Sequence, residues 1–256
     1  MISIDKYAYI NKLSGVHPME KFIFALGTLL LCLYLNSIPV SIVVIITMAY
    51  LTVVKAGVNT KFYYGLIRLP FYFLFLSIIA ILVGVVDCSK GVVCSINAFG
   101  IDIGITYTSL TTATNLFFKA MASVSCLYFL SLTTTLVDLI SILRKFKCPE
   151  LLLELISLVY KFIFVLIETA GKIYNAQWTR LGYSTLKNSF NSIGLLVSNL
   201  FIISYKKMTC LINALDARCY AGKLNVLEET YTYSKTNIFL IILFEVFIIS
   251  FALLIK

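Results

Sequence analysis

The sequence predicts an all-α integral membrane protein with about five transmembrane helices and a cytoplasmic insert of long helices before the last span. Hydrophobic residues make up 60% of the chain and charged residues only 13%, and the mean hydropathy is +0.96, values far from those of a soluble domain. Several apolar runs approach the length of a bilayer crossing, and one later stretch carries charge at helical spacing. The predicted domains are 1–136, 137–233 and 234–256.

Four apolar runs supply the predicted N-terminal spans. They cover residues 22–35, 40–54, 69–86 and 110–136. The first two are separated only by Asn36-Ser37-Ile38-Pro39, which predicts a tight helical hairpin. The following loop holds Lys55, Lys61 and Arg68 without an acidic residue, whereas loop 87–105 has no such basic excess. The positive-inside rule therefore favours a cytoplasmic N-terminus in a cell membrane, with no cleavable signal peptide expected.

A short basic amphipathic helix is predicted after the fourth span. Thr135-Leu136-Val137-Asp138 fits a capping box. Leu139, Ile142, Leu143 and Phe146 recur on one face, with Arg144, Lys145 and Lys147 opposite them. Pro149 is expected to end the helix. This pattern is typical of a helix that lies on an anionic membrane surface.

Two long helices are predicted next. The first starts at Glu150 and runs for some thirty residues, about 45 Å. Its part 151–167 is apolar enough to resemble a span, but Glu154 and Lys161 would each cost about 2.5–3.5 kcal/mol near a bilayer centre. We therefore favour a helix lying at the membrane surface, with a crossing as the alternative. The second helix is expected over about 188–219.

Both long helices are expected to end on an arginine. Arg180 lies near the end of the first, with Gly182 placed to supply a left-handed C-terminal residue. Arg218 lies near the end of the second, shortly before Gly222. The helix macrodipole alone favours a cation there by up to about 1 kcal/mol. The repetition in a basic region favours docking instead, because an arginine fork engages a carboxylate or helix-terminal carbonyls at two points.

The last span is predicted over 237–255. Lys119 and Glu245 are the charges inside predicted spans, and intramembrane charge points to an ion pathway by default. A self-contained channel or secondary transporter using these two residues is therefore the alternative function. A structural role is favoured, because Lys119 lies near a span end and Glu245 can be protonated or paired with a neighbour such as Lys119.

Catalytic and metal sites are not expected. The chain has no P-loop motif, no His-Glu-x-x-His and no nucleophile-base-acid set, so it is predicted not to be an enzyme. His17 is the only histidine, and we expect it to cap or pack rather than bind metal. Cys88 and Cys94 form the one close cysteine pair, as a disulfide or as free thiols. The +9 charge is explained by membrane topology rather than by nucleic-acid binding.

The helix ends also carry a family resemblance. Thr179-Arg180-Leu181 and Ala217-Arg218-Cys219 are similar to the paired Ala-Arg-Gly-type motifs of the transmembrane T components of energy-coupling factor (ECF) transporters. The segments 4–9 and 17–21 resemble the start of the CbiQ type, and the likeness covers nearly the whole chain. Thr179 departs from the usual Ala, and neither Leu181 nor Cys219 is the Gly or Ser often found third.

The resemblance implies a non-catalytic subunit of an ATP-driven importer. Its two arginine motifs would dock on a pair of ABC-type ATPase subunits, which bind the ATP, so no cofactor is expected in this chain. It further implies cobalt as cargo, with nickel as the close competitor. The metal would be held by a separate membrane subunit of the CbiM type, the substrate-binding S component.

Overall fold

The computed structural model describes residues 2–82, 84–85, 92–98, 101–220, 231 and 233–255. It divides into two compact units. The bundle unit comprises Met1–Leu139 and Glu229–Lys256, and the hairpin unit comprises Ile140–Glu228. The bundle unit contains the elements α1 (Ile2–Ile10), α2 (Pro18–Leu35), α3 (Ile38–Tyr50), the π-helical turn η1 (Leu51–Lys55), α4 (Thr60–Leu82), β1 (Gly84–Val85), β2 (Val92–Ala98), β3 (Ile101–Thr106), α5 (Tyr107–Thr133) and α9 (Lys235–Ile255).

The predicted helical membrane fold is confirmed. Among the described residues, six helices are long and apolar enough to cross a membrane, and five of them overlap the predicted spans. The third of these starts at Thr60, earlier than the predicted residue 69, because the loop after η1 is short. The sixth candidate is Leu186–Asp216, which the sequence predicts as a cytoplasmic helix. Its length and composition would allow a crossing; the helix that contains 151–167 does not meet these criteria.

A small antiparallel sheet between α4 and α5 was not predicted. Its strand order is β1-β3-β2, and Cys94 of β2 pairs with Ile105 of β3. The sequence does contain a strand signal here, since Ile101, Ile103 and Ile105 alternate with smaller or polar residues. The prediction of a plain loop over 87–105 is therefore wrong for the residues that form the strands. The possible Cys88–Cys94 disulfide falls outside the described residues, because Cys88 is not among them.

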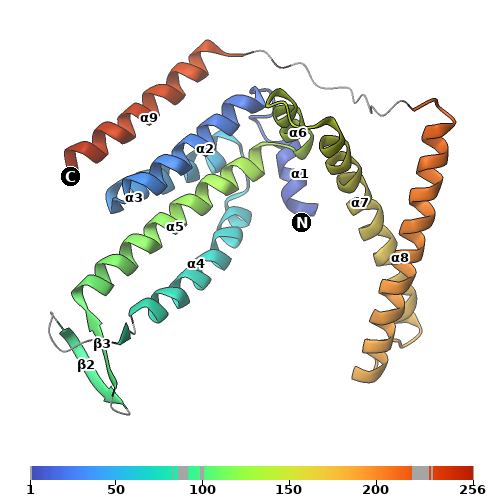
Figure 1. The fold of residues 1–256 in the computed structure, drawn as a ribbon, viewed down its shortest axis with the longest axis horizontal. Coiled ribbons are helices and arrows are strands. Elements are labelled where there is room, and N and C mark those ends of the chain that lie inside the picture. The colour runs from blue at the N-terminus through green and yellow to red at the C-terminus, as the bar shows by residue number, and fades with distance from the viewer. Residues whose placement is uncertain are drawn as a thin grey trace. The chain divides into compact units, whose positions relative to one another are not determined.

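Helix α5 is the centre of the bundle unit. It packs against α1, α2, α3 and α4, and α9 packs against α2 (Figure 1). Small and medium apolar side chains allow this close approach. The core comprises Phe24, Ala25, Cys32, Val40, Val44, Met48, Ala122, Cys126, Phe129, Ile248 and Ala252. The candidate spans are thus held together mainly by packing against α5.

Two buried polar side chains donate hydrogen bonds to the carbonyl groups at the C-terminal end of α5. Asn11 Nδ2 donates to the carbonyl oxygens of Leu132 and Thr133 at 3.4 and 3.3 Å. Lys21 Nζ donates to the Thr133 carbonyl at 3.1 Å, although this side chain is only 5% exposed. The last carbonyls of a helix lack partners in their own helix and carry partial negative charge. This explains why a lysine is stable in so buried a position.

A proline inside α4 is compensated by α5. Pro70 has no N–H, so the Leu66 carbonyl loses its normal helical partner. The hydroxyl of Tyr128 in α5 donates to that carbonyl at 3.3 Å. In a membrane such rescue matters, because lipid offers no hydrogen bonds to an orphaned backbone group.

The ends of α2, α6 (Leu136–Lys145) and α9 meet in one polar cluster. His17 caps α2 by accepting from the Met19 N–H at 3.0 Å, and its ring stacks on Tyr233 at 3.8 Å, so the expected capping and packing role is confirmed. Glu20 accepts from the Ser234 N–H and from Asn237 Nδ2. The predicted cap of α6 is also present, with the Asp138 N–H donating to Thr135 Oγ1 at 3.2 Å.

Candidate functional site

The hairpin unit is built from two consecutive long helices. Helix α7 covers Glu150–Thr179 and α8 covers Leu186–Asp216, and they pack against each other (Figure 1). Thr185 caps α8 by accepting from the Asn188 N–H at 3.3 Å. The predicted long helices are therefore present, and each spans about 45 Å at 1.5 Å per residue. Pro149 does not end the preceding helix as predicted; it is the N-cap of α7, and α6 ends through the left-handed Lys147.

The end of α7 is a Schellman turn centred on Arg180. The Leu181 N–H donates to the Trp178 carbonyl at 3.0 Å, and the Gly182 N–H donates to the Gln177 carbonyl at 2.9 Å. Leu181 has the left-handed φ of +58° that this motif requires. Arg180 is the C-cap residue between the helix and the left-handed position.

The end of α8 repeats this turn residue by residue. The Cys219 N–H donates to the Asp216 carbonyl at 3.0 Å, and the Tyr220 N–H donates to the Leu215 carbonyl at 3.1 Å. Cys219 has a left-handed φ of +54°. In both triplets the arginine is followed by a left-handed third residue. The first residue differs slightly, because Thr179 is the last residue of α7 and Ala217 is the C-cap of α8. The prediction that the two helices finish alike is confirmed at the level of single hydrogen bonds.

Gly182 has a different role from the one predicted. The left-handed residue is Leu181, so Gly182 is not needed for a positive φ. A Cβ at Gly182 would instead lie 2.7 Å from Ser192 Oγ and 2.9 Å from the Gln177 carbonyl oxygen. Gly182 is thus required for close approach between the turn and α8. The sequence could not distinguish the two roles, since both place a glycine just after a helix end.

Relief of backbone strain should stabilise the α7 turn. A left-handed leucine costs about 1–2 kcal/mol, of which the greater chain entropy of glycine offsets about 0.5–1 kcal/mol. Leu181 is 73% exposed and loses little packing on removal. We expect Leu181→Gly to raise the thermal midpoint of the hairpin unit in detergent, followed by the fluorescence of the single tryptophan, Trp178. Leu181→Val should lower the thermal midpoint, because a β-branched residue is disfavoured at positive φ. Equal midpoints in the wild type and both variants would show that the backbone at Leu181 is not strained.

The turn that carries Arg180 is held by contacts that sequence reasoning missed. Gln177 Nε2 donates to the Ser192 carbonyl at 3.0 Å, and Ser192 Oγ donates to the Gly182 carbonyl at 2.8 Å. The Tyr183 hydroxyl donates to Gln177 Oε1 at 2.8 Å, and its ring lies against Trp178. In the sequence, the aromatic residues near Arg180 are the signal that could have predicted these contacts. Together, the contacts leave the turn little freedom to reorient the guanidinium.

The other end of the hairpin is closed by one strong contact. The Tyr220 hydroxyl, next to the second turn, donates to Glu154 Oε2 of α7 at 2.6 Å. This hydrogen bond to a carboxylate raises the pKa of Tyr220, because it favours the protonated phenol. The pairing also gives the Glu154 carboxylate a hydrogen-bond partner. From the sequence alone, the only predicted effect of Glu154 is the cost of burying its charge in lipid.

Both guanidinium groups face outward. Arg180 and Arg218 are exposed, and neither makes an ion pair or side-chain hydrogen bond within the described part of the chain. Arg180 borders a groove of about 400 Å³ between α7 and α8. Because most of the 31 residues of α8 lie between the two turns, the arginines are about 40 Å apart. They cannot engage one small site together, but they suit two separate partners.

The two intramembrane charges do not pair with each other. Lys119 Nζ donates to Asn36 Oδ1 at 2.6 Å, in the connection between α2 and α3. Glu245 packs against Gly27 of α2, and its Oε1 is buried without a hydrogen-bond partner in the described residues. The suggested Lys119–Glu245 pair is therefore wrong, because Lys119 reaches the end of α2 instead. No cluster of three metal-ligating side chains occurs in the ranges that the structure describes.

Comparison with known proteins gives a consistent set of matches. Residues 11–230 match the family model CbiQ, described as cobalt transport protein. An uncharacterized protein of Methanocaldococcus jannaschii is 36% identical over 99% of this chain and 93% of its own length. The putative fused cobalt transport protein CbiMQ of Methanocorpusculum labreanum is 31% identical over 88% of this chain and 38% of its own length. The cobalt transport protein CbiQ of Salmonella typhimurium is 28% identical over 88% of this chain and its full length.

Proposed function

The chain belongs to the CbiQ family of cobalt transport proteins, and from this membership we propose that it is the T component of an ECF-type importer. It would couple ATP hydrolysis by two partner ATPase subunits to uptake of cobalt, or of nickel, through a separate membrane subunit. Arg180 and Arg218, with the residues beside them in each triplet, are the proposed docking points. The single observation that carries the proposal is the identical turn at the ends of α7 and α8.

The geometry of the hairpin unit supports transmission of motion. Each arginine is presented at the end of a helix of about 45 Å, and each turn is held by hydrogen bonds. When two ATPase subunits close on ATP and reopen, the distance between their binding sites for the two arginines changes. Helices that are continuous over this length carry such a displacement to the spans instead of absorbing it locally.

A separate metal-binding subunit fits the chemistry of the chain. His17, the only histidine, accepts from the Met19 backbone and stacks on Tyr233. The relative from Methanocorpusculum labreanum carries CbiM and CbiQ in one name, which supports a CbiM-type S component as the partner. We place the N-terminus and the hairpin unit on the cytoplasmic side, where the ATPases act.

Radioactive cobalt uptake into proteoliposomes tests this function. The chain reconstituted with its candidate ATPases and a CbiM-type subunit should take up cobalt only with hydrolysable ATP, and excess nickel should reveal which metal is preferred. The chain alone should show no uptake, because the power source is absent.

The alternative transporter makes the opposite prediction. If the chain is self-contained, it should move cobalt alone, and Lys119→Met or Glu245→Gln should abolish the movement. Uptake by the isolated chain would refute the proposed T-component function. If complexes that contain Lys119→Met or Glu245→Gln both retain ATP-driven cobalt uptake, the alternative function is refuted.

A further inference from the structure

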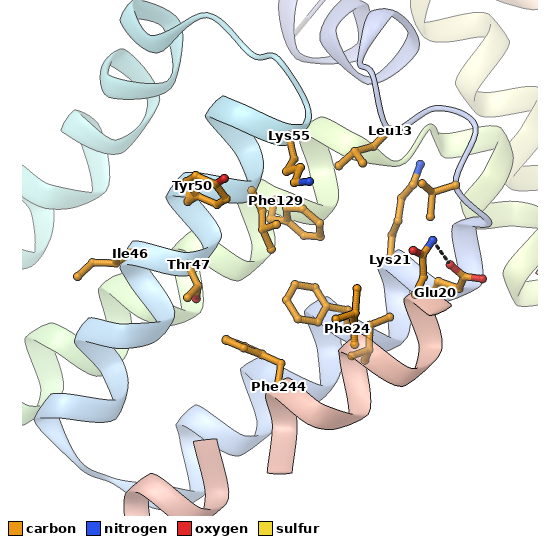
Figure 2. Close-up of a pocket in the computed structure, with 15 residues that line it drawn as sticks. Leu13, Glu20, Lys21, Phe24, Ile46, Thr47, Tyr50, Lys55, Phe129 and Phe244 are labelled. Atoms are coloured by element: carbon orange, nitrogen blue, oxygen red, sulfur yellow. Dashed lines mark hydrogen bonds between the residues drawn. The ribbon is translucent and has the colours of Figure 1, made fainter. Parts of the chain in front are cut away.

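The bundle unit contains a pocket that the proposed function does not use. Helices α2, α3 with η1, α5 and α9 enclose about 550 Å³ (Figure 2). Its walls are mainly aromatic and aliphatic, with Phe24, Ile46, Phe129 and Phe244 among them. Ile46 is 62% exposed and Leu240 58%, so the pocket opens on the outer surface of the bundle. In a membrane this surface faces lipid.

The charged side chains of the pocket and Asn237 lie at one depth. Lys21 lies in the first turn of the candidate span Pro18–Leu35, Lys55 is the last residue of Ile38–Lys55, and Asn237 lies in the first turn of Lys235–Leu254. All three are therefore at span ends, at the level of lipid headgroups. Ile46 and Phe244 lie in the middle of their spans, and Figure 2 shows them away from the two lysines.

The mouth of the pocket carries an exposed cation, Lys55, that forms no ion pair within the described residues. Of its charged lining residues, Lys21 and Lys55 are cations and Glu20 is the anion. Both Glu20 oxygens already accept hydrogen bonds, from Ser234 and Asn237. Lys21 donates one hydrogen bond to the Thr133 carbonyl, whereas the exposed Lys55 ammonium makes no hydrogen bond or ion pair within the described residues. Exposed Lys12 lies close by, since its N–H donates to the Ala56 carbonyl.

The volume and the charged end of the pocket suit a small amphipathic molecule. The volume of about 550 Å³ falls in the range of about 300–1,000 Å³ that is typical of small-molecule sites. A flexible hydrocarbon chain running down from a headgroup fits both the volume and the depth of the walls.

We propose that this pocket binds one anionic phospholipid, with an acyl chain along Phe24, Phe129 and Phe244 and the phosphate beside the Lys55 ammonium. The hydrocarbon contributes contact with the aromatic walls, and the lysines select the headgroup charge. An ammonium at the membrane surface attracts an anionic lipid, and a zwitterionic headgroup gains much less from it. A bound lipid would join α9 to α2 and α3 at the level where α9 enters the membrane.

Native mass spectrometry of the full chain in detergent tests the headgroup preference. Phosphatidylglycerol should bind at one site, more tightly than phosphatidylcholine with the same acyl chains. Lys55→Ala should reduce phosphatidylglycerol affinity about fivefold and leave phosphatidylcholine affinity unchanged. The matched control is Lys61→Ala, an exposed lysine at the start of α4 that does not line the pocket. Glycerol phosphate, an anionic phosphate ester without acyl chains, should not bind.

A photoreactive residue identifies the occupant in the membrane itself. Benzoylphenylalanine replacing Phe244 should cross-link to phospholipid in native membranes, giving the mass of one lipid. A cross-link to a polypeptide at this position would overturn the proposal in favour of a protein partner. Equal affinity for the two phospholipids, or equal effects of Lys55→Ala and Lys61→Ala, would overturn it as well. Both readouts are independent of ATPase docking and of metal transport.

Discussion

Reversal of both arginine charges, Arg180→Glu with Arg218→Glu, should abolish recovery of the ATPase subunits when the chain is purified. Each guanidinium is exposed at the end of a long helix and has no partner of its own in the described residues. Loss of one partner of a charge-assisted contact costs about 2–5 kcal/mol, or roughly 30- to 4,000-fold in affinity. The measurement is the amount of ATPase that co-purifies with tagged chain from detergent-solubilised membranes.

The single variants and a control make this result specific. Either variant alone should retain partial recovery, because two linked contacts reinforce each other and one remains. Lys187→Glu reverses an exposed charge in the first turn of α8 without touching a C-terminal turn, and it should leave recovery unchanged. All variants should still insert, since neither arginine contributes to the core of the bundle unit. Full recovery in the double variant would rule out docking through these residues.

Gly182→Ala should loosen the turn that carries Arg180. The added Cβ would meet Ser192 Oγ at 2.7 Å and the Gln177 carbonyl oxygen at 2.9 Å. The carbonyl belongs to the backbone of α7 and cannot rotate away, so the turn must shift relative to the end of α7 as well as to Ser192 of α8. Overpacking of this kind costs about 1–3 kcal/mol. We expect a lower thermal midpoint by Trp178 fluorescence, together with weaker ATPase recovery than in the wild type.

The chain offers a matched control for this substitution. Gly171 lies inside α7, and a Cβ there would have no atom within 4 Å. Gly171→Ala should therefore stabilise the helix by about 0.5–1 kcal/mol, through reduced chain entropy. The two glycine variants differ by one methyl group each and should move the midpoint in opposite directions. A shift of the same sign in both would contradict the close approach at Gly182.

The features that could be predicted from the sequence are those that depend on neighbouring residues. Five of the candidate spans follow from runs of apolar side chains, because transfer into lipid depends on local composition. The cap at Thr135 and the matching ends at Arg180 and Arg218 follow from residues within one or two helical turns. Strand β3 also has a local signal in the sequence, the alternating isoleucines at 101, 103 and 105.

Which side chains meet across the fold was decided only by tertiary structure. Lys119 contacts Asn36 rather than Glu245, and Gly182 makes room for Ser192 rather than supplying a positive φ. The pocket beside Lys55 likewise draws its walls from four helices. Hydropathy and helical period specify where each helix runs and which face is apolar. They do not specify its rotation, depth or neighbours, because those depend on packing between residues that are distant in the sequence.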